Sequence, residues 1–384
     1  MKRGVFAIIL ISIATSGFFI WEKSRDESVL KTTSVDEVIA SVLDERKKEL
    51  EQTSEPSDEQ KINILLLGLD QRKDWPDPHC DAIHLFTIDL ENKNLTITSV
   101  PRGTYARIMD THLPEEAYLS NACGIHGLEY GISEIERVLG VKHDYLITVN
   151  FSQALGIFRE LKLPTTETLQ WLRHRQSYAI GEPQRSHNQA VFMKDLIHSK
   201  LGLFANKLTL PLQYLLYTRV DTDMNFPTVR ALLTFVLKEG IDQDDTKIRL
   251  LMKPNYNTVD YHIDLDAPGA SVEPLIERLN GRLNEEDLSH KTLEATQEDL
   301  ISYLTERLTQ EDTVTDMCER QLWLQVEDDK TRNRLEYDFI SRCSEELEHD
   351  KAVDLLSDYI LELETRNDTP TLEQNAKEHL FELL

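Results

Sequence analysis

A largely apolar run near residue 60 is the feature that most constrains the fold of this chain. Residues Ile62 to Leu67 are nearly all aliphatic and lead into Gly68-Leu69-Asp70, and further apolar runs follow at Ala82 to Ile88 and Leu95 to Val100. A short aliphatic run without regular polar alternation is typical of a buried strand. The sequence therefore predicts a sheet that is covered by other elements.

The pattern after the first run alternates between strands and helices. Asn92-Lys93-Asn94 separates the second and third runs and predicts a hairpin turn. Apolar residues at helical spacing stop at Gly140, a strand is expected at Tyr145 to Phe151, and a helix follows at Ser152 to Leu161. Later helices are predicted at Gln189 to Leu201, Leu212 to Tyr217 and Val229 to Leu237. This alternation indicates an α/β domain over residues 61–258, with α/β/α layers around a central mixed sheet.

The last third of the chain has a different composition. Beyond about Pro268, leucines recur at helical spacing among many Asp and Glu residues. The segments concerned are Leu275 to Leu283, Leu300 to Leu308, Gln321 to Val326 and Val353 to Leu363. The pattern predicts amphipathic packing helices, so residues 259–384 are expected to form an all-α acidic extension. Such helices could dock on the α/β domain or bind a protein partner.

The N-terminus has the pattern of a single membrane anchor. Lys2 and Arg3 precede an uncharged, mostly apolar run, residues 5–21, whose length is within the range of membrane-spanning helices. The positive flank predicts a single-pass protein of the cell membrane whose later residues are extracytoplasmic. A cleaved signal peptide is the alternative, but the run lacks a clear small-x-small cleavage site. Residues 22–60 are expected to be a polar linker, with a short helix opened by Ser34-Val35-Asp36-Glu37.

Charge and cysteine content narrow the functional class. The formal net charge of -26 argues against nucleic acid binding, which needs a basic face. Cys80, Cys123, Cys318 and Cys343 would face an oxidising space, where two early and two late cysteines permit two disulfides. Buried free thiols are the alternative. The chain has no Cys-x-x-Cys spacing, so a zinc site has little support.

Two aspartates form a candidate metal site. Asp70 ends the first apolar run and Asp81 opens the second. Carboxylates that converge at strand ends could hold Mg²⁺, or Mn²⁺ in its place, together with a substrate phosphate. The plainer interpretation of the spacing is that Asp70 caps a turn and Asp81 lies in a surface loop.

Arginines near the ends of predicted elements form a second group of candidates. Arg102 follows Pro101, whose fixed φ could hold the guanidinium in place for two parallel hydrogen bonds to a phosphate. If Leu169 to Arg175 is extended, Arg173 and Arg175 lie on one face, where an anion would relieve their repulsion.

A further arginine and a glutamine lie together on a predicted helix. Arg185 and Gln189 are four residues apart and would share a helix face near an N-terminus, where anions are favoured. With the two aspartates and the other arginines, they could form a Mg²⁺-assisted phosphoryl-transfer site. The alternative is a basic surface patch that offsets the acidic C-terminal region.

These motifs, in this order, resemble those of the LytR-CpsA-Psr family of cell-envelope proteins. The family's Gly-x-Asp resembles Gly68-Leu69-Asp70, its Ser-Asp-Thr resembles Cys80-Asp81-Ala82, and its Pro-Arg-Asp-Thr resembles Pro101-Arg102-Gly103-Thr104. Further similar stretches are Tyr118 to Cys123, His143-Asp144-Tyr145, Arg173-His174-Arg175, Gln184 to Gln189 and Thr222-Asp223-Met224. The resemblance runs from about Ile62 to about Pro254, and its motifs are specific only in combination.

The resemblance implies an enzymatic function. Family members transfer a phosphate-linked glycopolymer from a polyprenyl pyrophosphate carrier to peptidoglycan. By that resemblance, Asp70 and Asp81 would assist metal and pyrophosphate binding, and the lipid tail would enter an apolar pocket between sheet and helices. The residues that would bind and polarise the pyrophosphate are Arg102, Arg173, Arg175 and Arg185, with Gln189 in support of the same network.

Three departures from the family pattern leave other functions open. Gly103 stands where the family has Asp, Asn188 stands where it has a second arginine, and the segment from Leu161 to Trp171 is short. One alternative is a noncatalytic scaffold that binds lipid-linked pyrophosphate or glycan. Another is a polyprenyl pyrophosphate phosphatase that uses water as the acceptor.

Overall fold

The computed structural model describes residues 60–70, 78–108, 117–174, 178, 180–205, 209–271, 293–310, 314–366 and 369–383. The anchor predicted at residues 5–21, the linker before residue 60 and the helix predicted at Leu275 to Leu283 lie outside these residues. Among the helices of the described ranges, none has both the length and the apolar character that crossing a bilayer requires.

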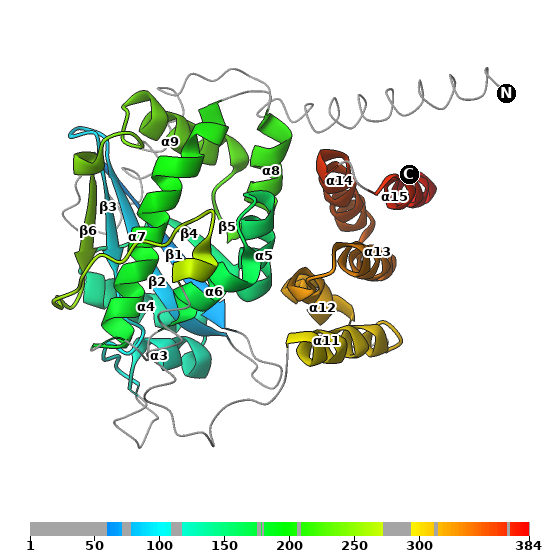
Figure 1. The fold of residues 1–384 in the computed structure, drawn as a ribbon, viewed down its shortest axis with the longest axis horizontal. Helices are drawn as coiled ribbons and strands as arrows, with labels where there is room; N and C mark the ends of the chain where they lie inside the picture. The colour runs from blue at the N-terminus through cyan, green and yellow to red at the C-terminus, as the bar shows by residue number, and fades with distance from the viewer. Residues whose placement is uncertain are drawn as a thin grey trace. The chain divides into compact units, whose positions relative to one another are not determined.

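A mixed sheet of six strands organises the N-terminal part of the described chain (Figure 1). Its strands are β1 (Lys61–Asp70), β2 (His79–Asp89), β3 (Asn94–Ser99), β4 (Tyr145–Asn150), β5 (Asp221–Thr222) and β6 (Ile248–Met252), in the order β5-β4-β1-β2-β3-β6. β1 is parallel to β4 and β3 is parallel to β6, whereas the other neighbouring strands are antiparallel. The predicted α/β class with a mixed sheet is therefore confirmed, while β6 was not predicted.

The hairpin predicted between the second and third runs is confirmed. β2 and β3 pair antiparallel from Asp89 opposite Asn94. Asp89 accepts hydrogen bonds from the backbone N–H of Asn92 at 2.8 Å and from its side chain at 3.0 Å, and Lys93 has a φ of 53°. The Asx-type contact of Asn92 and the left-handed conformation of Lys93 close the turn.

The two faces of the sheet contact different helices. Ile83 and Leu85 lie in a buried cluster with residues of α3 (Leu119–His126) and α4 (Leu128–Leu139). His84, between them on β2, points to the opposite face and contacts α7 (Glu182–Lys200). Because side chains alternate along a strand, helices cover both faces. Figure 1 shows α7 running beside β3 and β6, which it contacts.

Most helices of the α/β part match the sequence pattern. α4 ends at Gly140, which has a left-handed φ of 70°, as predicted. α5 (Phe151–Glu160) confirms the helix expected after β4, and α7 begins seven residues before its predicted start at Gln189. The remaining helices of this part are α6 (Thr165–Arg173), α8 (Leu210–Thr218), α9 (Phe226–Lys238) and the short η2 (Leu201–Ala205) and η4 (Asp245–Lys247).

Most described residues from 293 onward are helical, as the leucine spacing predicts, whereas residues 259–267 of the expected all-α region form no helix. The helices are α11 (Leu293–Arg307), α12 (Val314–Arg320), α13 (Asp329–Glu346), α14 (His349–Arg366) and α15 (Pro370–Leu383). The segment predicted at Gln321 to Val326 forms the short 3₁₀ turn η7 (Leu322–Gln325). The domain boundary placed at residue 258 stays a prediction.

Two compact units account for the described residues. Residues 60–223 and 236–384 belong to one unit, and residues 224–235, most of α9, belong to the other. In the smaller unit Asn225 accepts a hydrogen bond from the backbone N–H of Thr228 at 2.9 Å and so caps the helix.

Buried ion pairs join the C-terminal helices to α5 and α8 within the larger unit. Arg366 of α14 lies 3.0 Å from Glu160 of α5 and 3.4 Å from Glu336 of α13. Arg219, directly after α8, pairs with Glu362 of α14. Burial, and then the charge of Glu362, raise the pKa of Glu336. Buried charges need such partners, so these pairs fix how the C-terminal helices contact α5.

Candidate functional site

The candidate residues gather at one edge of the sheet. Leu69 pairs with Asn150 of β4 on one side and with Cys80 of β2 on the other, and Asp70 pairs with His79. The ends of β1 and β4 therefore meet the start of β2 at this edge. β3 also ends here, since it is antiparallel to β2 and leads directly into Arg102.

A β-bulge places Asp81 at this edge. Gly68 pairs with Ala82 and Leu69 pairs with Cys80, so Asp81 is an extra residue without a partner on β1. A Cβ atom on Gly68 would come within 2.8 Å of the Ala82 Cβ, so only glycine allows this close approach. Bulges commonly redirect a side chain next to a functional site.

Asp81 and Arg102 form an ion pair at this site. Arg102 donates from Nη1 to Asp81 Oδ1, and Ser120 at the start of α3 donates to the same oxygen at 3.3 Å. Burial lowers the pKa of Arg102, but Asp81 and Glu182 outweigh burial, so its net pKa is raised. Arg102 is therefore a permanent cation held beside the bulge.

Arg185 approaches the same bulge from α7. Its Nη2 donates to the backbone carbonyl oxygen of Asp81 at 3.0 Å, and its Nε and Nη2 donate to Glu182 Oε1 at 3.1 and 2.6 Å. The side chain of Glu182 also lies 3.7 Å from Arg102 Nε. Burial lowers the pKa of Arg185, which is 5% exposed. One carboxylate therefore bridges two guanidinium groups.

Arg173 lies at the same sheet edge but in a different conformation from the predicted one. The interpretation of Leu169 to Arg175 as extended is wrong, because α6 continues to Arg173. Thr168 and Trp171 are buried three residues apart, which is helical spacing. The Arg173 guanidinium lies 4.7 Å from the ring centre of Phe151, the first residue after β4. Arg175 lies outside the described residues.

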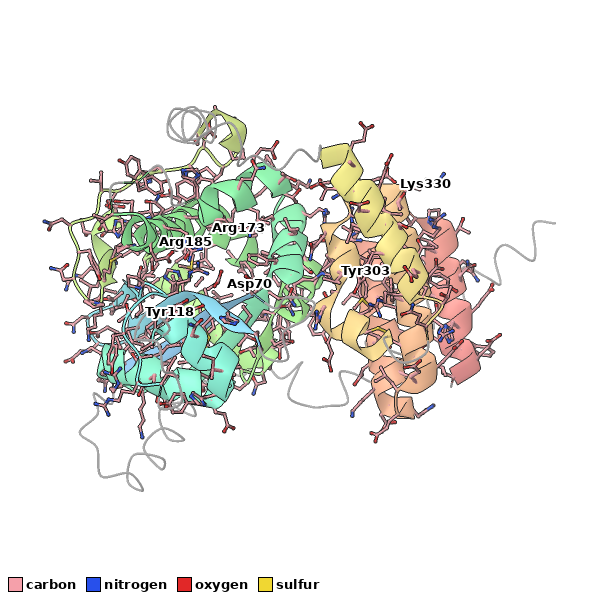
Figure 2. All side chains as sticks on the ribbon, turned by 90° about the horizontal axis from the view of Figure 1, so that it is seen from below. Asp70, Tyr118, Arg173, Arg185, Tyr303 and Lys330 are labelled. Atoms are coloured by element: carbon pink, nitrogen blue, oxygen red, sulfur yellow. A yellow bond between two sulfur atoms is a disulfide. The ribbon has the colours of Figure 1, made fainter. Side chains whose placement is uncertain are left out.

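Figure 2 labels Asp70, Arg173 and Arg185 in the α/β part of the chain, and Tyr303 and Lys330 on the C-terminal helices. Asp70 is 8% exposed.

Within the described residues, no group of three or more His, Cys, Asp or Glu side chains could hold a metal. Two carboxylates on neighbouring strands are still a donor set that suits Mg²⁺, which commonly takes its other ligands from phosphate and water.

Gln189 contacts the interior of the α/β part. It accepts from His84 Nε2 at 3.2 Å and donates to the backbone carbonyl oxygen of Leu172 at 3.1 Å. Burial, and then the charge of Arg185, lower the pKa of His84 from 6.5 to about 4, although the Gln189 hydrogen bond acts in the opposite direction. The His84 imidazole is therefore neutral near pH 7.

Two of the three departures from the expected motifs, Gly103 and Asn188, differ in their surroundings. A Cβ atom on Gly103 would have nothing within 4 Å. Asn188 is 1% exposed and accepts a hydrogen bond from Gln184 Nε2 at 2.8 Å. Space for a larger side chain therefore exists at residue 103 and is lacking at residue 188.

A disulfide ties the helix that carries Ser120 to the strand that carries Asp81. Cys80 bonds to Cys123 of α3, and Cys318 bonds to Cys343 in the C-terminal helices. Both of the disulfides that the cysteine count permits are therefore present. The first one links residues that directly flank the site.

Sequence reasoning missed three residues of this site, Glu182, Ser120 and His84. Pro183 at the first turn of α7 and an acidic residue before it are typical of a helix start, and they could have extended the predicted helix back to Glu182. Ser120 lies in the stretch Tyr118 to Cys123, whose resemblance to a family motif could have identified it, whereas His84 had no pattern that could have done so.

One protein-family model matches part of this chain. Residues 28–156 match the LytR_cpsA_psr family. A protein of Bacillus mycoides named polyisoprenyl-teichoic acid–peptidoglycan teichoic acid transferase TagU is 27% identical over 152 residues, which are 39% of this chain and 48% of that protein. TagU of Bacillus cereus is 26% identical over 149 residues, 39% of this chain and 46% of its own length. The chain thus aligns with about half the length of these relatives.

Solved structures also match part of this chain. The crystal structure of Bacillus subtilis TagV covers 58% of this chain and 99% of its own, with 17% identity and a TM-score of 0.42. The structure of Bacillus subtilis TagT covers 59% of this chain and 94% of its own, with 15% identity and a TM-score of 0.38.

Proposed function

We propose that this chain, a divergent member of the LytR-CpsA-Psr family, is a phosphotransferase that moves a glycopolymer from a polyprenyl pyrophosphate carrier to peptidoglycan. The names of its TagU relatives describe a transfer of this kind. The observation that carries the proposal is the pair of guanidinium groups, Arg102 and Arg185, that Glu182 bridges beside Asp81.

A pyrophosphate suits this arrangement chemically. Arg102 and Arg185 already hold carboxylate oxygens of Glu182 and Asp81, and phosphate oxygens are acceptors of the same kind. A bound pyrophosphate would take over donors that Glu182 now occupies. Arg173, exposed beside Phe151, would add a third guanidinium from the other side of the edge.

In the proposed reaction, the acceptor hydroxyl oxygen attacks the phosphorus that carries the glycan. The bond from that phosphorus to the bridging oxygen breaks, and polyprenyl phosphate leaves with the bond's electron pair. The hydroxyl proton passes to a carboxylate at the edge, Asp70 or Asp81. The guanidinium groups neutralise charge on the transferred and leaving phosphates, which is the main contribution that phosphoryl transfer requires.

A divalent cation belongs to the proposal as well. Asp70 and Asp81 would hold Mg²⁺ or Mn²⁺, and the ion would supply charge neutralisation at the phosphates. Asp81 can serve both the ion and Arg102, because a carboxylate has two oxygens and several lone pairs.

An extracytoplasmic location completes the proposed function. The uncharged run at residues 5–21 would anchor the chain in the cell membrane, with residues 22–60 as a spacer. The catalytic residues would then act where peptidoglycan is found. The C-terminal helices could also contact a protein partner.

A noncatalytic binding function is the second candidate. Gly103 supplies no carboxylate, and the buried Asn188 supplies no charge. A chain with these two residues could bind a lipid-linked pyrophosphate without transferring it.

One experiment separates these functions. The full chain in detergent, with Mg²⁺, a polyprenyl pyrophosphate-linked glycan and peptidoglycan fragments, should release polyprenyl phosphate and attach glycan to the fragments. Release of pyrophosphate-cleavage products without attachment would indicate a phosphatase. Binding of the lipid without any release would contradict the transferase and favour the noncatalytic function.

A further inference from the structure

A polar histidine of β2 lies in the buried layer between β2 and α7, and the residues on either side of it in the strand are apolar. His84 lies between the apolar Ile83 and Leu85 and is 1% exposed. Its Nδ1 is buried and makes no hydrogen bond within the described structure. Burying a polar atom in this way lowers stability, so an apolar residue would serve simple packing better.

The hydrogen bonds around Gln189 determine its orientation. Gln189 Nε2 donates to the Leu172 carbonyl oxygen at 3.1 Å, so its Oε1 is the atom that faces His84. The opposite orientation would place two oxygens against each other. His84 must therefore carry its proton on Nε2 and donate to Gln189 at 3.2 Å.

The three linked residues each neighbour a charged residue of the candidate site. Leu172 directly precedes Arg173 at the end of α6, and Gln189 lies one helical turn after Arg185 on α7. His84 is on β2, which carries the bulge at Asp81 near its start. The chain of hydrogen bonds thus connects the three elements that hold these charges.

We infer that Gln189 is a positioning residue for the pyrophosphate-binding arginines, which acts through His84 and the Leu172 carbonyl group without touching the substrate. The inference rests on the proposed function and changes the predicted catalytic role of Gln189. Side-chain hydrogen bonds in a buried layer are directional, so they set the spacing between α6, α7 and β2 more strictly than apolar contacts would.

Matched variants test this inference in the full chain. His84→Met and Gln189→Met remove the hydrogen bond at similar volume, and His84→Gln keeps a donor near the position of Nε2. Ile83→Val, a buried change on the opposite face of β2, controls for lost stability. The measurements are the affinity for inorganic pyrophosphate with Mg²⁺, by calorimetry, and the thermal midpoint.

The expected pattern is specific. Each methionine variant weakens pyrophosphate binding by about tenfold, as outer hydrogen-bond partners of metal ligands do when changed. The double variant is no weaker than either single variant, because both changes break one chain of hydrogen bonds. His84→Gln stays within about threefold of the wild type, and Ile83→Val binds normally despite a lower thermal midpoint.

Two results would overturn this inference and leave the proposed function intact. One is wild-type affinity in both methionine variants with lowered thermal midpoints, which is the behaviour of residues that only pack. The other is losses that add in the double variant, which means that the two residues act separately. Absence of pyrophosphate binding by the wild type would instead overturn the proposed function and the inference together.

Discussion

Arg185 donates a hydrogen bond from its Nη2 to the backbone carbonyl oxygen of Asp81 at 3.0 Å, and so joins α7 to the bulge of β2. The same guanidinium holds Glu182, which also approaches Arg102. Since these donors already point at oxygen atoms in a largely buried setting, an anion can bind without reorganising them.

Restoring a carboxylate at residue 103 should increase turnover. Nothing lies within 4 Å of a Cβ placed on Gly103, so Gly103→Asp should change the free energy of unfolding by no more than about 0.5 kcal/mol. If the missing carboxylate limits the reaction, Mg²⁺-dependent turnover should rise by roughly tenfold or more.

The matched control for that experiment is Gly103→Asn, which has the same shape without the charge. Equal turnover in both variants would contradict a role for the carboxylate. Asn188→Arg is unsuitable for the same purpose, because residue 188 is buried and the added charge should destabilise the fold by several kcal/mol.

Because the His84 imidazole is buried, we expect the folded protein to lose stability in mild acid. Its pKa is lowered from 6.5 to about 4 by burial and then by Arg185, so the unfolded chain takes up this proton more readily than the folded chain. Stability should be complete above about pH 6.5 and fall as the pH approaches 4, by up to about 3 kcal/mol from this group. Urea unfolding of the wild type and His84→Met across this range should show a shallower pH dependence in the variant. Parallel curves would contradict the prediction.

The disulfide beside the site should affect both stability and binding. Replacing Cys80 and Cys123 by alanine removes a crosslink between residues 43 positions apart, which should cost about 4 kcal/mol. Pyrophosphate affinity should fall as well, because α3 positions Ser120 against Asp81.

The matching change at Cys318 and Cys343 is the control for this effect. That pair spans 25 positions within the C-terminal helices, so its loss should lower the thermal midpoint and leave pyrophosphate affinity unchanged. Equal losses of affinity in both double variants would show that the effect is only one of stability.

Ion pairs between the C-terminal helices and α5 should contribute strongly to stability. Arg366→Met would leave Glu160 and Glu336 buried without this partner and should lower the free energy of unfolding by about 3–5 kcal/mol. Arg342→Met, at a half-exposed pair with Glu346, should cost less than about 1 kcal/mol. Similar costs for the two variants, measured by urea unfolding, would contradict the importance of the buried network.

Local patterns predicted much of the fold. The run at Ile62 to Leu67, the turn at Asn92-Lys93-Asn94 and the stop at Gly140 each depend on neighbouring residues, and each prediction was confirmed. The short strand β6 was missed, since its pairing partner β3 is about 150 residues earlier in the chain.

The site was less predictable because its geometry depends on register and packing. The bulge at Asp81 exists only in the pairing of β1 with β2, and Glu182 reaches Arg102 only when α7 begins at residue 182. The extended conformation considered for Leu169 to Arg175 does not hold at Arg173, because Thr168 and Trp171 are buried at helical spacing and α6 continues to Arg173. The roles assigned to Asp70, Asp81 and the arginines stay predictions.

The most direct test of the proposed phosphotransfer site measures the release of polyprenyl phosphate from a polyprenyl pyrophosphate-linked glycan. The proteins compared are the full-length wild type, Arg185→Gln and Arg249→Gln, each with Mg²⁺ and with a chelator. Arg249 is an exposed arginine of β6 and serves as the control. The wild type and Arg249→Gln should release polyprenyl phosphate only with metal. The rate of release by Arg185→Gln should be lower by about 10²–10³-fold. Undiminished release by Arg185→Gln would contradict a phosphotransfer site at this edge of the sheet.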